Sequence, residues 1–201
     1  MSDSYIKIAT IKEIQEPEFK SRRVIEWMQQ NNYIESELSK SGLGLDDLAF
    51  KPGSNHVEII GYDENITRLN ACGVEFKTGR QVSNSLAFNP LIKMTCKHCG
   101  ENRFKDFTPQ EFYTDATPPD KLKLYTDMFK IFENWENGET VLLTCPTCEQ
   151  QSNLDENVIE GSICFTNFEM TFWNWPDLKT EFISDLQDLI QSPIKQMNGH
   201  L

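Results

Sequence analysis

Two Cys-x-x-Cys pairs constrain this chain more than any other feature of its sequence. They are Cys96-Lys97-His98-Cys99 and Cys145-Pro146-Thr147-Cys148, and 45 residues separate them. Each pair suits a knuckle, a tight turn that aims two thiolates at one point. Four thiolates around Zn²⁺ form a closed tetrahedral shell of the structural type, whereas a catalytic zinc keeps an open position. The spacing therefore predicts one structural Zn²⁺ with the ligands Cys96, Cys99, Cys145 and Cys148.

Other uses of these cysteines stay open at this point. Either pair can serve as a redox dithiol, and four cysteines can also hold an iron–sulfur cluster. His98 is an alternative ligand inside the first knuckle, although we expect it to face solvent. The remaining Cys72 and Cys164 are expected to behave as small buried hydrophobic residues. Glu149 stands where the first knuckle has the flexible Gly100, so we expect the second turn to be less ideal.

Hydrophobic periodicity and turn residues predict the elements around the knuckles. Helices are expected from Glu16-Pro17 to Asn31-Asn32, from Thr117 to Asn137-Gly138, and over residues 178–192. Strands are expected at residues 5–10, 45–51, 57–61, 141–144 and 194–201, with residues 161–173 forming one bent strand or two short ones. Residues 73–77 and 80–82 are expected to pair as a hairpin about Thr78-Gly79.

This order of elements predicts an α+β fold with a mixed sheet and helices packed on it. Residues 1–93 form an N-terminal α+β part, and residues 151–201 form a C-terminal β-α-β part that completes the main domain. Residues 94–150 form a four-cysteine, zinc-ribbon-like insertion with one helix, which the metal closes into a loop on a rigid base.

Charge is unevenly distributed over the 201 residues. The net charge is −12, and residues 101–201 hold 7 Lys and Arg against 18 Asp and Glu. Phosphate backbones repel such a surface, so nucleic-acid binding is disfavoured. The acidity serves solubility alone, or it favours a basic protein partner. No run of about 20 apolar residues is present, as a membrane helix would require, and charges interrupt the N-terminal segment, so we expect no membrane association and a cytoplasmic protein.

Familiar catalytic motifs are absent from the sequence. It contains no G-x-x-x-x-G-K-[ST], no H-E-x-x-H and no G-x-S-x-G, and only three histidines. The chain is therefore not expected to be an enzyme. A pocket with clustered carboxylates of perturbed pKa would favour an unfamiliar enzyme instead.

The run Phe165-Thr166-Asn167-Phe168-Glu169-Met170-Thr171-Phe172-Trp173-Asn174-Trp175-Pro176, together with the two knuckles and a terminal helix that leads into a strand, resembles a bacterial family of unknown function. Some members of that family are named sugar ABC transporter ATPases. The resemblance implies a bacterial origin and a fold with an inserted zinc ribbon, but no activity. An ATPase of that kind needs a Walker loop, which this sequence lacks.

The aromatic cluster at the end of this run has two interpretations. Aromatic residues at a strand-to-helix corner commonly seal a core, but exposed ones anchor protein interfaces. Alternation along a strand would place Trp173 and Trp175 on one side and Phe172 and Asn174 on the other. Trp173 and Trp175 are therefore candidate partner-binding residues.

Together these observations predict a non-enzymatic, acidic, zinc-containing protein-binding module. Its most specific form is an immunity-type inhibitor of a basic bacterial toxin. The alternatives are a zinc-ribbon nucleic-acid-binding or regulatory protein and an enzyme with an unrecognised carboxylate site. The sequence leaves the partner and the oligomeric state open.

Overall fold

The computed structural model describes residues 3–43, 47–61, 71–84, 93–102, 119–161 and 163–200. The chain divides into two compact units. The first unit comprises Met1–Gly79 and Thr166–Leu201, and the second comprises Arg80–Phe165. Two long strands, β4 (Val74–Asn84) and β9 (Ile163–Trp173), carry the chain across this boundary. The second unit is therefore an insertion in the first, and its bounds lie outside the expected residues 94–150.

A six-stranded sheet with the order β10-β1-β9-β4-β3-β2 forms the first unit. Besides β4 and β9 it contains β1 (Ser4–Thr10), β2 (Ile34–Ser39), β3 (Ala49–Pro52) and β10 (Ile194–His200). The registered pairings of β1 with β10, β1 with β9, β2 with β3 and β3 with β4 are antiparallel. The α+β class is confirmed.

The sequence predicted a mixed sheet, but the pairings with a described register are antiparallel. The two helical crossovers explain this difference. The helix after β1 leads to β2 at the far edge of the sheet, and the helix after β9 leads to β10 on the other side of β1. Neither crossover places its second strand beside its first, so neither forms a pair of neighbouring parallel strands.

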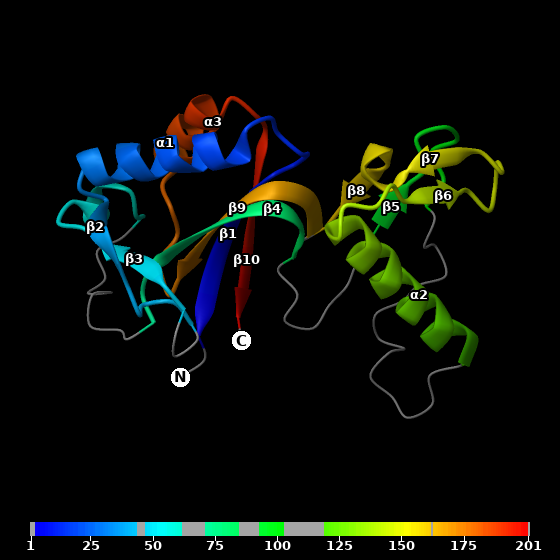
Figure 1. Ribbon diagram of the computed structural model, residues 1–201, viewed down its shortest axis with the longest axis horizontal. Coiled ribbons are helices and arrows are strands. Elements are labelled where there is room, and N and C mark those ends of the chain that lie inside the picture. Colours follow the sequence, from blue (N-terminus) through cyan, green and yellow to red (C-terminus); the bar gives the residue numbers. More distant parts are fainter. Residues whose placement is uncertain are drawn as a thin grey trace. The chain divides into compact units, whose positions relative to one another are not determined.

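Helices α1 (Pro17–Gln30) and α3 (Thr180–Ile190) pack on one face of this sheet (Figure 1). Pro17 opens α1 at a position where its missing N–H costs little. The Asn31 side chain donates to the Trp27 carbonyl at 2.8 Å and ends the helix. The core between helices and sheet includes, among others, Ile8, Val24, Met28, Met170, Phe172 and Leu186.

Two expected elements are wrong. In place of the strand expected at residues 57–61 stands a short 3₁₀ helix (His56–Glu58), followed by one bridge from Ile60 to Leu178. The hairpin expected about Gly79 is instead the continuous strand β4. Gly79 has φ +96°, a conformation that suits a turn or a local irregularity within a strand equally well. The strand expected at residues 45–51 appears as β3, and the expected helix start at Thr117 lies outside the described residues.

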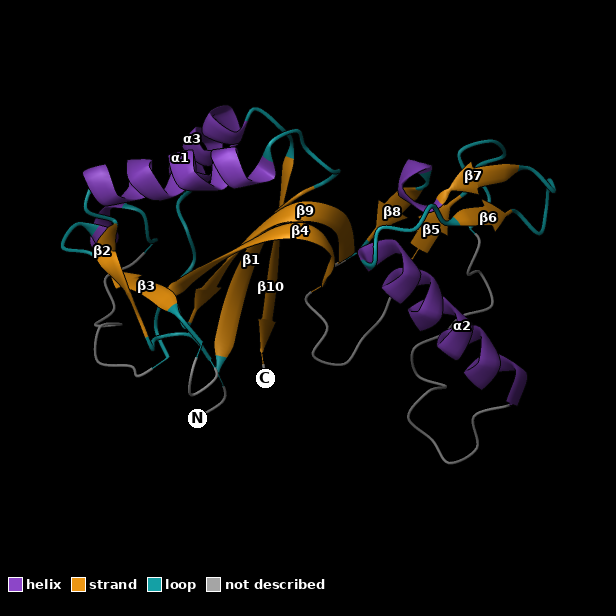
Figure 2. Ribbon diagram, viewed as in Figure 1, coloured by secondary structure: helices purple, strands orange, loops and turns teal. Residues whose placement is uncertain are grey.

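Short strands and one long helix build the described part of the second unit (Figure 2). Strand β5 (Lys93–Thr95) pairs with β8 (Val158–Glu160), and β6 (Leu142–Thr144) pairs with β7 (Gln151–Asn153). Helix α2 (Pro119–Glu136) and a 3₁₀ helix (Leu154–Glu156) also belong to this unit. Its described core consists of Met94, Met128, Phe132, Trp135, Leu154, Ile163 and Phe165. The last two come from β9, which is why the unit extends past residue 150.

Candidate metal centre

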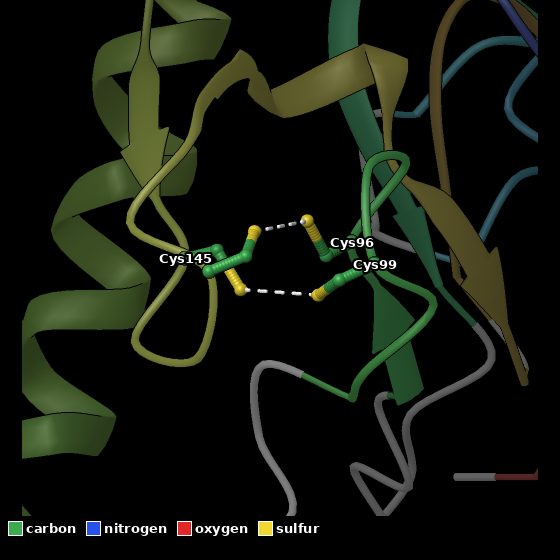
Figure 3. Close-up of side chains that lie close together, drawn as sticks. Cys96, Cys99 and Cys145 are labelled. Atoms are coloured by element: carbon green, nitrogen blue, oxygen red, sulfur yellow. Dashed lines mark hydrogen bonds between the residues drawn. The ribbon is translucent and has the colours of Figure 1, made fainter.

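The four predicted cysteines converge on one point in the second unit. Their sulfur atoms all lie within 4.8 Å of one another. Figure 3 shows Cys96 and Cys99 on one loop facing Cys145 on another, and the Cys99 and Cys145 sulfurs are 3.7 Å apart. Cys96 and Cys148 sulfurs are 3.9 Å apart. A tetrahedral site with metal–sulfur bonds of about 2.3 Å has sulfur–sulfur edges of about 3.8 Å.

These distances distinguish one four-sulfur site from two dithiols. Sulfur contacts of 3.9 Å and 3.7 Å join cysteines of different knuckles, Cys96 with Cys148 and Cys99 with Cys145, and all four sulfurs lie within 4.8 Å of one another. A redox dithiol would instead use the two sulfurs of a single Cys-x-x-Cys. The structure thus brings together the full predicted ligand set in an arrangement positioned to bind one metal ion.

Strand ends hold the two knuckles in place. β5 delivers Cys96, and a bridge between Thr95 and Asn102 closes the first loop behind it. β6 delivers Cys145, and its pairing with β7 closes the second loop. Each knuckle is therefore a loop closed by backbone pairing at its base.

Both knuckle loops have the same backbone hydrogen bonds. In each, the first cysteine donates to the carbonyl five residues on and accepts from the N–H four residues on, all at 2.9 Å: Cys96 with Glu101 and Gly100, and Cys145 with Gln150 and Glu149. The residue that donates this N–H to the cysteine carbonyl has positive φ in both loops. Gly100 has φ +76° and Glu149 has φ +59°. The second turn is thus formed as well as the first, and Glu149 bears the backbone strain that Gly100 avoids.

Backbone N–H groups favour the thiolate forms at this site. The N–H of Cys148, aided by that of Thr147, lowers the pKa of the Cys145 thiol to about 6. Burial acts to raise the pKa of Cys96, but the N–H groups of His98 and Cys99 outweigh it and the pKa is lowered.

The Cys99 thiol differs, because its surroundings oppose loss of its proton. Although the N–H of Glu101 acts to lower it, burial and the neighbouring sulfurs raise the pKa of Cys99 to about 12. Thiolates this close repel one another, so full ionisation needs a cation among them. The donor set fits a metal with a preference for sulfur.

His98 is not placed as a ligand. It is exposed, as expected, and its Nε2 lies 3.1 Å from the carbonyl oxygen of Gln151. Beside it, Lys97 forms an ion pair of 2.7 Å with Glu156, and this contact lowers the pKa of the Glu156 carboxyl. Both contacts join the first knuckle to residues that follow the second knuckle, and they support the approach of the two loops.

The two remaining cysteines are buried, which confirms that expectation. Cys72 is 2% exposed in the core of the first unit, and Cys164 is 3% exposed. Burial raises the pKa of the Cys72 thiol to about 12, so it is inert at neutral pH.

Trp173 and Trp175, the candidate partner-binding residues, are core residues instead. They are 9% and 4% exposed. Asn174 has φ +55°, which breaks the alternation of the strand. Trp175 therefore meets Phe172 edge-on at 5.3 Å, and Trp173 meets Tyr5 at 5.5 Å. Neither indole is available as an exposed anchor.

Two buried carboxylates escaped the sequence analysis. Glu75 on β4 is 9% exposed and Glu169 on β9 is 2% exposed. Burial, and to a lesser degree Asp47 and Glu169, raises the pKa of the Glu75 carboxyl against the lowering effects of Trp173 and Lys77. A signal for buried carboxylates was present in the sequence: a single Glu lies between two apolar residues of a strand, as in Phe168-Glu169-Met170.

Comparison with protein-family models, with curated proteins and with solved structures finds no match to this chain. The resemblance to a bacterial zinc-ribbon family accordingly stays a hypothesis. Among the described residues, no helix has the length and apolar character needed to cross a membrane.

Proposed function

We propose that this chain is a zinc-stabilised, non-enzymatic protein-binding module of the cytoplasm that recognises a basic protein through an acidic face. In its most specific form it is an immunity-type inhibitor that neutralises a basic bacterial toxin. The four-cysteine cluster supports a structural role for the metal, because a closed four-sulfur shell leaves no position for substrate.

Zinc is the proposed metal because a tetrahedral four-thiolate site selects zinc or iron, and an isolated four-cysteine ribbon is typical of zinc. Elemental analysis of the purified chain should find one zinc per chain. Iron in place of zinc, with the visible absorption of iron–thiolate bonds, would contradict this assignment. A chain with Cys145→Ser should bind far less metal.

The observation that carries the protein-binding proposal is an acidic row along α3. Glu181, Asp185 and Asp188 recur at four- and three-residue spacing, and all three are exposed. They share one side of the helix, while Phe182, Leu186 and Ile190 face the core. A row of like charge steers a partner of opposite charge and disfavours nucleic acid.

A pull-down from the native cell tests this proposal. We expect the wild-type chain to retain a stoichiometric basic protein that high salt releases. Neutralising the row with Glu181→Gln, Asp185→Asn and Asp188→Asn should reduce retention at least tenfold. Neutralising three exposed carboxylates of the second unit, with Glu133→Gln, Glu139→Gln and Glu149→Gln, is the matched control. If both variants lose retention of the basic protein equally, net charge alone explains the effect. That result would contradict specific binding by the acidic row of α3.

The immunity role needs its own measurement. Co-expression of the chain with the captured basic protein should relieve toxicity in a bacterial host, and the α3 variant should relieve it less. Toxicity that persists with wild-type chain in excess would contradict inhibition while leaving protein binding intact.

A second candidate function, an enzyme with a carboxylate site, has one observation in its favour. Glu75 is buried beside a second carboxylate and has a raised pKa, as many acid–base catalysts do. Screening for turnover with the wild-type chain and with Glu75→Gln tests it. Activity that the substitution abolishes would replace the protein-binding proposal.

A further inference from the structure

The six-stranded sheet of the first unit has two edge strands, β2 and β10. An edge strand presents unpaired backbone N–H and C=O groups, so natural proteins commonly protect it with charges, a bulge or a covering group. β2 has all three. It carries the exposed Glu35 and Glu37, and its register with β3 is irregular. The Gln29 side chain donates to the carbonyls of Glu35 and Ser36 at 3.4 and 3.1 Å.

β10, at the opposite edge, is far less protected. It pairs with β1 in an unbroken register over its seven residues, from Ile194 to His200. It contains no Pro, Asp or Glu, and Lys195 is its one charged side chain when His200 is neutral. Gln196, Asn198 and His200 are exposed. A regular, exposed strand of this kind can accept another strand at its edge.

Alternate residues of β10 direct their backbone groups toward this open edge. Ile11 donates its N–H to the Pro193 carbonyl at 3.1 Å, so these two residues are a hydrogen-bonded pair of the ladder with β1. Such pairs recur at every second residue of an antiparallel ladder. The odd-numbered residues of β10 therefore bond to β1, and the even-numbered ones direct their N–H and C=O groups away from it. These outward residues are Ile194, Gln196, Asn198 and His200.

The outward groups match those of a second β10 strand. Within the described part of the chain, no strand pairs with them. Two antiparallel copies related by a two-fold axis at Met197 would pair Ile194 with His200 and Gln196 with Asn198, and each pair would occur twice. Each pair exchanges two hydrogen bonds, so every outward N–H and C=O would have a partner.

The side chains are compatible with this pairing. Lys195 would lie opposite Gly199, which has no side chain, so the two lysines would not face each other. Gln196 would lie opposite Asn198, and both amides can donate and accept. Within one chain, Gln196 already donates to Asn198 at 3.1 Å. In β2, by contrast, the same kind of pairing would place Glu35 opposite Glu37, and like charges directly opposite are destabilising.

Charge also favours a second copy at β10 over the basic protein proposed above. The chain has a net charge of −12, so two copies repel each other wherever both present carboxylates. β10 has no carboxylate and one lysine. Two acidic copies can therefore meet along this strand without facing carboxylates, whereas a basic protein finds no acidic side chain on it.

We propose that the chain forms a two-fold dimer in which β10 pairs with β10 of a second copy. The two six-stranded sheets would then join into one continuous sheet. This inference goes beyond the proposed function, because it uses neither the acidic row of α3 nor the metal centre.

Analytical ultracentrifugation of the zinc-loaded full chain tests the dimer. We expect the mass to rise from 23.3 kDa toward twice that value with increasing concentration. Gln196→Glu with Asn198→Glu places like charges opposite each other and should raise the dissociation constant by about tenfold or more. Gln30→Glu with Ser36→Glu adds the same charge at exposed residues outside β10 and should dimerise as wild type does. A monomer at every concentration, or equal loss in both variants, would overturn the proposal.

Two further variants test the register and the backbone pairing. Gln196→Lys with Asn198→Glu places opposite charges across the two-fold axis, so it should dimerise more tightly than the doubly acidic variant by about tenfold. Gln196→Pro removes one outward N–H from each copy. Proline is tolerated where the N–H of an edge strand faces solvent, so the monomer should fold while the dimer weakens. Dimers of Gln196→Pro as tight as those of wild type would overturn the pairing.

Hydrogen exchange followed by NMR gives a readout that a general change in stability would not produce. The N–H groups of Gln196 and Asn198 should become protected only at concentrations where the dimer forms. Those of Lys195 and Met197 should be protected at every concentration, because they bond to β1. A dimer that forms without added protection of Gln196 and Asn198 would use another surface and would overturn the proposal.

Discussion

Different features stabilise the first unit and the second unit. In the first, two helices and a six-stranded sheet enclose a cluster of eighteen buried hydrophobic residues. In the second, the strands of both small sheets are three residues long and the described core has seven buried residues. Strands of three residues rarely hold a fold alone, and small natural proteins add a metal in such cases. We therefore expect a metal held by the four cysteines to contribute much of the stability of the second unit.

Removing the metal should have the largest effect on stability, and it should affect the two units differently. Structural zinc contributes about 10–16 kcal/mol of apparent binding free energy, which is folding free energy for the residues it holds. Chelation, or Cys96→Ser with Cys145→Ser, should therefore unfold the second unit and leave the first folded. Hydrogen exchange read by mass spectrometry should show lost protection in residues 93–102 and 140–160, and native protection in β1, α1 and α3.

Cys72→Ser is the control for that experiment, because Cys72 is a buried cysteine of the first unit that lies outside the cluster. It should leave protection of the second unit and the zinc content unchanged. If chelation unfolds both units together, the two are a single cooperative structure and the comparison is broken.

Replacing one buried tryptophan in the core of each unit should have the next largest effect on stability. Trp175→Ala should lower the free energy of unfolding of the first unit by about 3–5 kcal/mol, because it empties a site packed against Phe172. Zinc content should stay at one per chain. Denaturant unfolding followed by far-ultraviolet circular dichroism measures the change.

Trp135→Ala is the matched substitution in the second unit, where the ring packs against Phe165 at 5.2 Å and beneath Arg80 at 5.1 Å. We expect it to weaken zinc binding, since metal and core stabilise the same residues, and to leave the first unit unaffected. Weaker zinc binding in Trp175→Ala than in Trp135→Ala would contradict the separate roles of the two cores.

The metal site could be predicted from sequence because its information is local. A Cys-x-x-Cys pair directs two sulfurs to one point whatever the surrounding fold, so two pairs predict the ligand set. The ends of α1 were predictable for a similar reason, because Pro17 and Asn31 act on the residues next to them.

The features that escaped prediction depend on partners distant in sequence or on backbone torsion. A glycine with positive φ ends a hairpin or bends a strand, and nothing near Gly79 decides between the two. Positive φ at Asn174 separates Trp173 from Trp175, which simple alternation cannot foresee. The burial of Glu75 depends on β9, whose residues come about ninety positions later. Backbone torsion decided the first two outcomes, and long-range pairing decided the third.

The smallest expected effects come from changing the backbone strain at one residue of each knuckle. Gly100 and Glu149 occupy equivalent positions at positive φ. A Cβ on Gly100 would meet nothing within 4 Å, so Gly100→Ala introduces backbone strain of about 1–2 kcal/mol and no clash. Glu149→Gly relieves similar strain but adds chain entropy to the unfolded state, so its net gain should stay below about 1 kcal/mol.

Competition with a zinc chelator at fixed pH measures both changes as affinities. Gly100→Ala should weaken zinc binding by roughly five- to thirtyfold, since a tenfold change corresponds to about 1.4 kcal/mol, and Glu149→Gly should strengthen it by less than about fivefold. If the two knuckles have equivalent backbones as well as equivalent ligands, the zinc affinity of the wild-type chain should lie between those of the two variants. If Glu149→Gly weakens binding instead, the second knuckle depends on the Glu149 side chain and the equivalence of the two loops is limited to their hydrogen bonds.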